Sequence, residues 1–151
     1  MSAIYLDACY LAKLLIEEPD SRSVADLVSG HDIVACCVHG RAEVAATLHR
    51  KLQEGAITRA EHDRGAECLM ALVGRGQVRW LPLVDMVLLR IERAYGATGS
   101  RLHLRSADAL HLACAVEHGF ATVWTSDRQM HAGAKAFGIA CQAAPRRGDL
   151  R

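Results

Sequence analysis

Short apolar runs and helical repeats alternate along the chain. The apolar runs, typical of buried strands, cover residues 3–7, 32–36, 78–81, 121–125 and 139–141. Between them, apolar residues recur every three or four positions, which predicts helices over 9–17, 21–28, 39–53, 58–73, 84–95, 106–116 and 128–137. Strands that alternate with helices indicate an α/β domain with a short, mainly parallel sheet covered on both faces, an α/β/α arrangement in three layers.

Local signals define several boundaries of these elements. Thr58 and Glu61 form a capping box, in which each side chain accepts a hydrogen bond from a free N–H group at the helix start. Ser106 is expected to cap the helix that follows it, and residues 96–100 are expected to form a loop. No linker or repeat interrupts the pattern. We therefore predict one domain over residues 1–143 and a flexible tail over 144–151.

Composition narrows the functional classes. Among 151 residues, 18 are basic and 17 acidic, a net charge of +1 that excludes a strongly basic nucleic-acid coat but permits a local basic rim. The sequence starts with a strand instead of a secretion signal, and no apolar run approaches the ~18 residues of a membrane span. Six cysteines without a C-x-x-C pair are typical of reduced thiols. We expect a cytoplasmic protein with no membrane contact.

Four acids occupy positions that are not the solvated helix faces or turns where acids are usually found. Asp7 and Asp127 follow predicted strands, and ligands of open α/β sheets bind outside the carboxyl ends of strands. Glu43 and Asp108 lie in the first turns of predicted helices, where the neighbouring residues are small or apolar. Each acid also has a structural interpretation, as a helix N-cap or as a favourable charge near a helix dipole. Their joint occurrence favours a shared site.

Four segments that contain these acids resemble the acidic motifs of PIN-domain nucleases, in order. They are YLDACYLAKLL, RAEVAATLHRKL, LRSADALHLACAVEHG and VWTSDRQMHAGAKAFGI. The similarity is greatest to VapC-type toxins of bacterial toxin–antitoxin pairs and extends from residue 3 to about residue 142. The resemblance implies a PIN-like α/β/α fold and an endoribonuclease that cleaves single-stranded or loop RNA, leaving 5′-phosphate and 3′-hydroxyl ends.

The resemblance also implies a metal site. Asp7, Glu43, Asp108 and Asp127 would be the catalytic and metal-binding acids, with Thr125 in support. Mg²⁺ prefers such oxygen ligands, and Mn²⁺ can substitute for it. We expect Asp7 and Asp108 to hold the ion most directly. In this family a Ser or Thr usually follows the first acid, whereas Ala8 and Cys9 follow Asp7 here, which changes the hydroxyl groups available to the site.

Several basic residues lie near the motifs. Arg41, Arg105 and Arg128 are candidates for phosphate contacts, although scattered arginines are usually solvated. His111 is interpreted as a general acid, a phosphate contact or the partner of a buried carboxylate, and we favour the last. A zinc site at His31, Cys36, Cys37 and His39 is disfavoured because adjacent residues of a strand face opposite ways.

The same resemblance implies partners for the protein, and two alternative functions remain open. A VapC-type toxin implies an RNA substrate, a small cognate antitoxin and a homodimer, with apolar helix positions such as Leu11 and Leu69 available to these protein contacts. One alternative is a catalytically weakened PIN-like binding module. Another is a receiver-like phospho-acceptor domain, which is disfavoured because such domains need adjacent acids near the first strand and a late lysine.

Overall fold

Parallel strands form the centre of the protein. The computed structural model describes residues 1–145, and its strands are β1 (Ala3–Tyr5), β2 (Ile33–Cys37), β3 (Val78–Leu81), β4 (Thr122–Trp124) and β5 (Ala140–Gln142). One sheet has the order β1-β2-β3 and a second pairs β4 with β5. A parallel bridge between Leu6 and Trp124 joins the two, so that the strands follow one another in space as β3-β2-β1-β4-β5.

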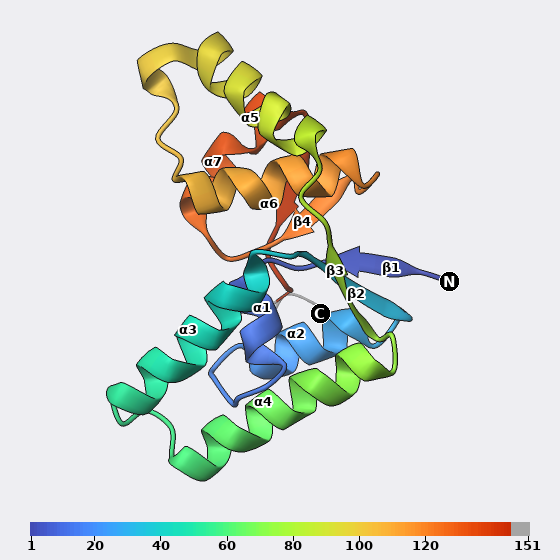
Figure 1. The fold of residues 1–151 in the computed structure, drawn as a ribbon, viewed down its shortest axis with the longest axis vertical. Coiled ribbons are helices and arrows are strands. Elements are labelled where there is room, and N and C mark those ends of the chain that lie inside the picture. The colour runs from blue at the N-terminus through green and yellow to red at the C-terminus, as the bar shows by residue number, and fades with distance from the viewer. Residues whose placement is uncertain (146–151) are drawn as a thin grey trace.

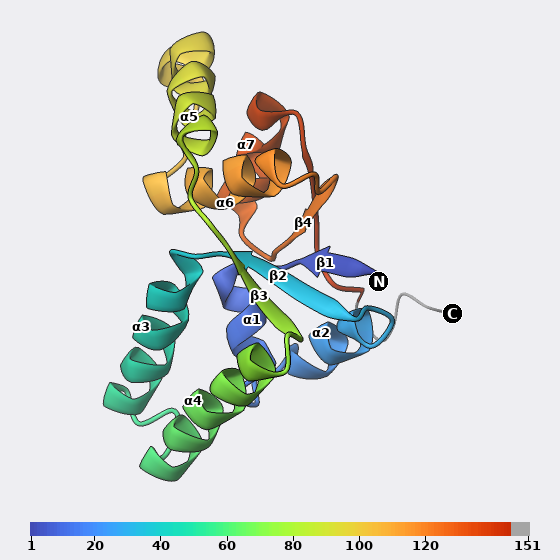
Figure 2. The same cartoon turned by 45° about the vertical axis from the view of Figure 1, so that its right-hand side comes forward.

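Helices cover both faces of these strands, as Figures 1 and 2 show. The first four helices lie on one side and the last three on the other, which makes three layers. The prediction of an α/β/α fold is confirmed. The helices are α1 (Ala8–Lys13), α2 (Ser21–Val28), α3 (Gly40–Gln53), α4 (Arg59–Gly74), α5 (Asp85–Thr98), α6 (Ser106–Glu117) and α7 (Arg128–Gly133).

Successive residues of the central strands enter two different cores. In β2, Ala35 and Cys37 pack in the cluster on the α5–α7 side, whereas Val34 and Cys36 pack in the cluster on the α1–α4 side. All five β2 residues are buried because helices cover both of its faces. This explains why the strand is continuously apolar in the sequence.

The observed boundaries correct three predictions. The first helix ends at Lys13, and the chain then turns, with the Ser21 hydroxyl donating to the Ile16 carbonyl. The predicted loop 96–100 is mostly helical: α5 continues to Thr98, and a 3₁₀ turn over Gly99–Arg101 follows. The segment 128–137 divides into α7 and a 3₁₀ turn over Ala134–Phe137.

Two expectations about helix starts had different outcomes. The capping box of α4 is confirmed, with Glu61 N–H donating to the Thr58 hydroxyl and Thr58 N–H donating to the Glu61 carboxylate. Ser106 is the first residue of α6 instead of its cap, which is Arg105 without a capping side-chain bond. The start of α6 therefore has no capping side chain, and Asp108 is the acid in its first turn.

The end of the described chain packs on the fold. The Ala144 N–H donates to the Tyr10 hydroxyl at 3.0 Å, so residue 144 is attached to α1. Most of the predicted flexible tail, residues 146–151, lies outside the described residues. Within the described part of the chain, none of the helices has the length and apolar character to cross a bilayer.

Candidate active site

The strand order reverses between β1 and β4, and two of the candidate acids lie there. Asp7 directly follows Leu6, and its N–H donates to the carbonyl of Trp124 in the neighbouring strand. Asp127 follows β4 by three positions and begins α7. A crevice at the carboxyl ends of strands on either side of such a reversal is the usual ligand position in open α/β folds.

Asp7 is the most enclosed of the four acids, with 3% of its surface exposed. One carboxylate oxygen, Oδ1, caps α1 by accepting the Tyr10 N–H at 2.8 Å. The other, Oδ2, accepts the Thr125 hydroxyl at 2.5 Å. Burial raises the pKa of Asp7 and outweighs these hydrogen bonds and the charge of His111, which lower it. A buried carboxylate of this kind is stabilised by a nearby cation.

Thr125 links Asp7 to Asp127. Its buried hydroxyl donates to Asp7 and accepts the Asp127 N–H at 2.9 Å. The Asp127 carboxylate uses Oδ1 to cap α7, accepting from the N–H groups of residues 129 and 130. Its other oxygen, Oδ2, faces Arg105. The predicted supporting contact of Thr125 with the acids is therefore present, although this hydroxyl comes from β4 and not from the position after Asp7.

Asp108 and Asp127 share a cation. Asp108, 6% exposed, accepts from Arg105 Nε at 3.1 Å, and a terminal nitrogen of the same guanidinium lies 3.5 Å from Asp127 Oδ2. Hydrogen bonding to Asp108 and its charge raise the pKa of Arg105. Because the Arg105 side chain is 72% exposed, solvent surrounds this positive charge on one side. A cation is thus already placed between two of the acids.

Glu43 contacts two imidazoles. Its Oε2 lies 2.7 Å from Nε2 of His111 and 3.3 Å from Nε2 of His39. Burial alone would raise the pKa of Glu43, but hydrogen bonds and charges of His111 and His39 lower it to about 2. Of the three roles considered for His111, the contact with a carboxylate is the one observed.

The four acids converge around Cys9 and Arg105. Burial raises the pKa of the Cys9 thiol to about 11, and the charges of Asp7, Glu43 and Asp127 contribute to the shift. The guanidinium of Arg105 interacts with Asp108, with Asp127 and with Cys9. Side chains from the N-caps of α1 and α7 and from α3 and α6 therefore lie near one another.

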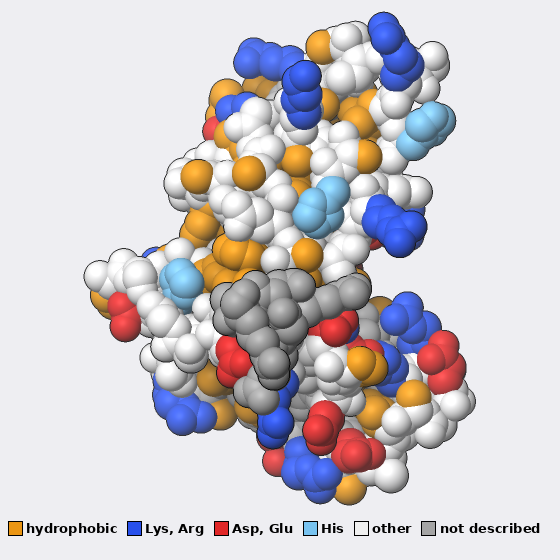
Figure 3. Space-filling view, turned by 180° about the vertical axis from the view of Figure 1, so that it is seen from behind, with side chains coloured by type: hydrophobic (Ala, Val, Ile, Leu, Met, Phe, Trp, Pro, Cys, Tyr) orange, Lys and Arg blue, Asp and Glu red, His pale blue; other side chains and the backbone are white. Residues whose placement is uncertain are grey.

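Other predicted residues are placed differently. Arg41 lines a groove between α3 and α4, and Arg128 is exposed at the first position of α7. Arg105 binds acids of the site. Leu11, expected on the surface, is fully buried in the core, whereas Leu69 lines the α3–α4 groove. The basic side chains in Figure 3 are distributed over the molecule and do not form one patch on that face.

Sequence reasoning missed two residues of the site. Tyr5 points its hydroxyl at Nδ1 of His111 from inside β1, at 3.0 Å. His39 was considered only as a zinc ligand beside Cys36 and Cys37. Its position four residues before Glu43, at the start of a helix, is the signal that predicts their proximity. No local pattern indicates the tyrosine contact, because the two residues are 106 positions apart.

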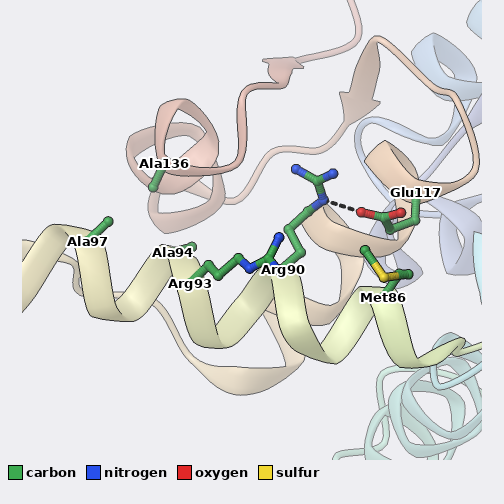
Figure 4. Close-up of a pocket in the computed structure, with 7 residues that line it drawn as sticks. All are labelled: Met86, Arg90, Arg93, Ala94, Ala97, Glu117 and Ala136. Carbon is green, nitrogen blue, oxygen red and sulfur yellow. Dashed lines mark hydrogen bonds and ion pairs between the residues drawn. The ribbon is translucent and has the colours of Figure 1, made fainter.

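A second pocket lies apart from these acids. It lies between α5, the C-terminal end of α6 and Ala136, and Figure 4 shows Arg90 directed at Glu117 across it. Their contact is 2.5 Å long, so the charge of Arg90 is compensated within the protein. The pocket contains none of the four candidate acids.

The sequence matches the family model described as PIN domain over residues 4–136. The chain belongs to the PIN domain family. The resemblance noted in its acidic motifs is thereby confirmed. Two Mycobacterium tuberculosis proteins named ribonuclease VapC45 and ribonuclease VapC49 are each 30% identical to it, and the alignment covers 99% of this chain and of each relative.

Solved structures of PIN proteins share the fold. VapBC2 of Rickettsia felis, bound to a promoter DNA fragment, aligns with a TM-score of 0.65 and 10% identity, covering 93% of this chain and 98% of that chain. FitAcB of Neisseria gonorrhoeae aligns with a TM-score of 0.64 and 18% identity, covering 91% and 95%. VapC20 of M. tuberculosis, described as a sarcin–ricin loop cleaving toxin, aligns with a TM-score of 0.62 and 16% identity, covering 85% and 93%.

Proposed function

We propose that this PIN protein is a divalent-metal-dependent endoribonuclease that acts on single-stranded or loop RNA as the toxin of a toxin–antitoxin pair. The observation that carries the proposal is the convergence of Asp7, Glu43, Asp108 and Asp127 at the strand reversal. Relatives of the same length are named ribonucleases, and one structural neighbour is described as a toxin that cleaves an RNA loop. These names support the reaction class.

The donor set fits a hard divalent ion. Carboxylate oxygens are the ligands that Mg²⁺ and Mn²⁺ prefer. The raised pKa of Asp7 and the guanidinium between Asp108 and Asp127 both indicate that this acidic group needs positive charge. Asp7 and Asp108 would hold the ion, with Glu43 and Asp127 completing its surroundings. When bound, Mg²⁺ would supply an activated water and neutralise charge on the phosphate that this water attacks, from which the 3′ oxygen leaves.

The protein's own side chains would prepare the site for this chemistry. The Tyr10 N–H and the Thr125 hydroxyl fix both oxygens of Asp7, which limits their motion before a substrate arrives. Arg105 is exposed and near the acids, so it can exchange a carboxylate for an RNA phosphate. Arg128, at the start of α7 beside Asp127, is positioned for a second phosphate contact. Arg41 lies farther along the α3–α4 groove.

Cleavage of a labelled stem–loop RNA by the full-length chain tests the proposal. We expect cutting with Mg²⁺ or Mn²⁺, none with EDTA, and products with 5′-phosphate ends. Asp108→Asn should reduce the rate by about 100-fold or more, because metal stabilisation of the transition state contributes several kcal/mol. Asp63→Asn on α4 is the matched control, since Asp63 is an exposed acid paired with Arg59. Equal rates for both variants, or cleavage in EDTA, would reject the proposal.

We also propose that a small antitoxin and a second copy of the chain bind this protein. A groove of about 540 Å³ between α3 and α4 has an apolar lining suited to a partner helix, including Leu48, Leu69, Met70, Val73 and Trp80. The R. felis neighbour is named as VapBC2, a two-component complex. Co-expression with the product of an adjacent small gene should relieve growth arrest, and light scattering of the purified chain should give twice the monomer mass.

A further inference from the structure

Two imidazoles and a carboxylate meet on one side of the acidic group. One possible ligand atom of His39, of Glu43 and of His111 lies within 4.8 Å of each of the others. The two histidine rings have centroids 4.3 Å apart. His39 and Glu43 are four residues apart at the start of α3 and so share a face of the helix, and His111 faces them from α6.

The imidazoles are held by contacts behind them. Nδ1 of His111 lies 3.0 Å from the Tyr5 hydroxyl, which in turn accepts the Cys37 N–H at 3.1 Å. Nε2 of His39 lies 3.1 Å from the carbonyl of Ala107. Backbone carbonyls and hydroxyls bound to one ring nitrogen are the usual way in which proteins orient metal-binding histidines. The cluster therefore has the supporting contacts of a built site.

Two further observations favour a ligand here. Nδ1 of His39 is buried and makes no hydrogen bond to any residue in the described part of the chain, so this imidazole has an unused nitrogen. Gly40 allows the start of α3 to lie against β2, because a Cβ at residue 40 would lie 2.5 Å from the Cys36 sulfur. The absence of a side chain at this position therefore determines where His39 and Glu43, on either side of it, lie.

The donor atoms select a type of ion. Imidazole nitrogen suits Zn²⁺ and Co²⁺ better than Mg²⁺, which favours oxygen. Zinc sites with three protein ligands, including sets of two histidines and one glutamate, leave a position open for water. With metal–ligand bonds of about 2.1 Å, tetrahedral ligand atoms lie roughly 3.4 Å apart. The possible ligand atoms of the three side chains lie within 4.8 Å of one another, so small side-chain movements would bring them to this spacing.

We propose that His39, Glu43 and His111 form a binding site for a transition-metal ion of the Zn²⁺ or Co²⁺ class, with one nitrogen from each imidazole and one carboxylate oxygen as ligands. It is separate from the oxygen site of Asp7, Asp108 and Asp127 and shares only Glu43 with the acidic group. The inference depends on the geometry of these three side chains and holds whether or not the chain cleaves RNA.

Titration of the metal-free, full-length protein with Co²⁺ tests this site. Visible absorption of bound Co²⁺ reports nitrogen and oxygen ligands, whereas a strong near-ultraviolet charge-transfer band reports thiolate ligands. With excess Mg²⁺ present to occupy the oxygen site, we expect one equivalent of Co²⁺ with the visible bands alone, displaced by Zn²⁺. His39→Gln and Glu43→Gln, two half-buried positions, should each weaken binding by about 100-fold or more. Asp108→Asn is the matched control and should retain the spectrum and its affinity.

Three results would overturn the assignment. One is the failure of the wild-type protein to bind stoichiometric Co²⁺. Another is a thiolate band, which would place the ion at cysteines. The third is loss of binding in Asp108→Asn together with retention in His39→Gln, which would place the ion among the acids. Circular dichroism of both glutamine variants verifies their folding. Because Glu43 also belongs to the acidic group, the His39→Gln variant decides the question. The Asp108→Asn result is independent of RNA cleavage, so loss of nuclease activity and loss of this site are distinguishable.

Discussion

Removing the Thr125 hydroxyl is the sharpest test of how the site is held together. This fully buried group donates to Asp7 and accepts from the Asp127 backbone, so a single oxygen atom serves both acids. Thr125→Val keeps the branched shape and removes the hydroxyl. Thr125→Ser, the matched control, keeps the hydroxyl and removes one methyl group.

The structure sets the size of the expected effect. A hydrogen bond to a charged group contributes roughly 1.5–3 kcal/mol, and a buried N–H left without a partner costs at least about 1 kcal/mol. Thr125→Val should therefore lower the free energy of unfolding by about 3 kcal/mol. Thr125→Ser removes one buried methyl and should cost about 1 kcal/mol. For a chain of this length, each kcal/mol lowers Tm by roughly 2–4 °C.

Thermal and urea unfolding at pH 7 in EDTA measures both variants against the wild-type protein. We expect a fall in Tm of about 6–12 °C for the valine variant and about 2–4 °C for the serine variant. The stabilisation of the protein by millimolar Mg²⁺ should also be smaller for valine, because Asp7 is less well fixed. A valine variant as stable as the serine variant would refute the role assigned to this hydroxyl.

Two other predictions concern burial. Because burial raises the pKa of Asp7 above its ordinary value of 3.8, its contribution to stability is lost as pH rises above that value, so Asp7→Asn should gain stability over metal-free wild type as pH rises above about 4, by at most roughly 1.4 kcal/mol per pH unit. Parallel stability curves of the two proteins, from urea titrations in EDTA, would contradict this account. Gly40→Ala places a Cβ against the Cys36 sulfur and should cost about 1–3 kcal/mol, whereas Gly96→Ala, with open space in α5, should stabilise the protein by up to about 1 kcal/mol. Thermal melts that show equal effects of these two alanines would refute the tight packing at residue 40.

The sequence predicts the order of the elements well because the periods of helix and strand are local properties. The buried strand before Asp7 and the capping box at Thr58 are examples, and both are present in the structure. Helix ends are less predictable where tertiary contacts decide them. Helix α5 passes through Gly96 and ends at Thr98, before Gly99 with its positive φ of 59°, while the Tyr95 hydroxyl donates to the Leu104 carbonyl nearby.

The sequence predicts the acids of the site better than it predicts the residues that contact them. Strand ends and first helical turns indicate where Asp7 and Asp127 lie, because topology places such positions at one edge. The contact of His111 with Glu43 joins residues 68 positions apart, and that of Thr125 with Asp7 joins residues 118 apart. Such pairs depend on side-chain directions across the sheet, which a local pattern does not contain.

The bridge between Leu6 and Trp124, which joins the two sheets, also has a consequence for synthesis of the protein. The Thr125 donor to Asp7 is synthesised 118 residues after Asp7, and the Trp124 carbonyl that accepts the Asp7 N–H directly precedes that donor. A nascent chain that stops before β4 therefore lacks Asp127 and the hydroxyl that orients Asp7. The acidic group can therefore assemble only after β4 and Asp127 have been synthesised, which delays any reactivity until then.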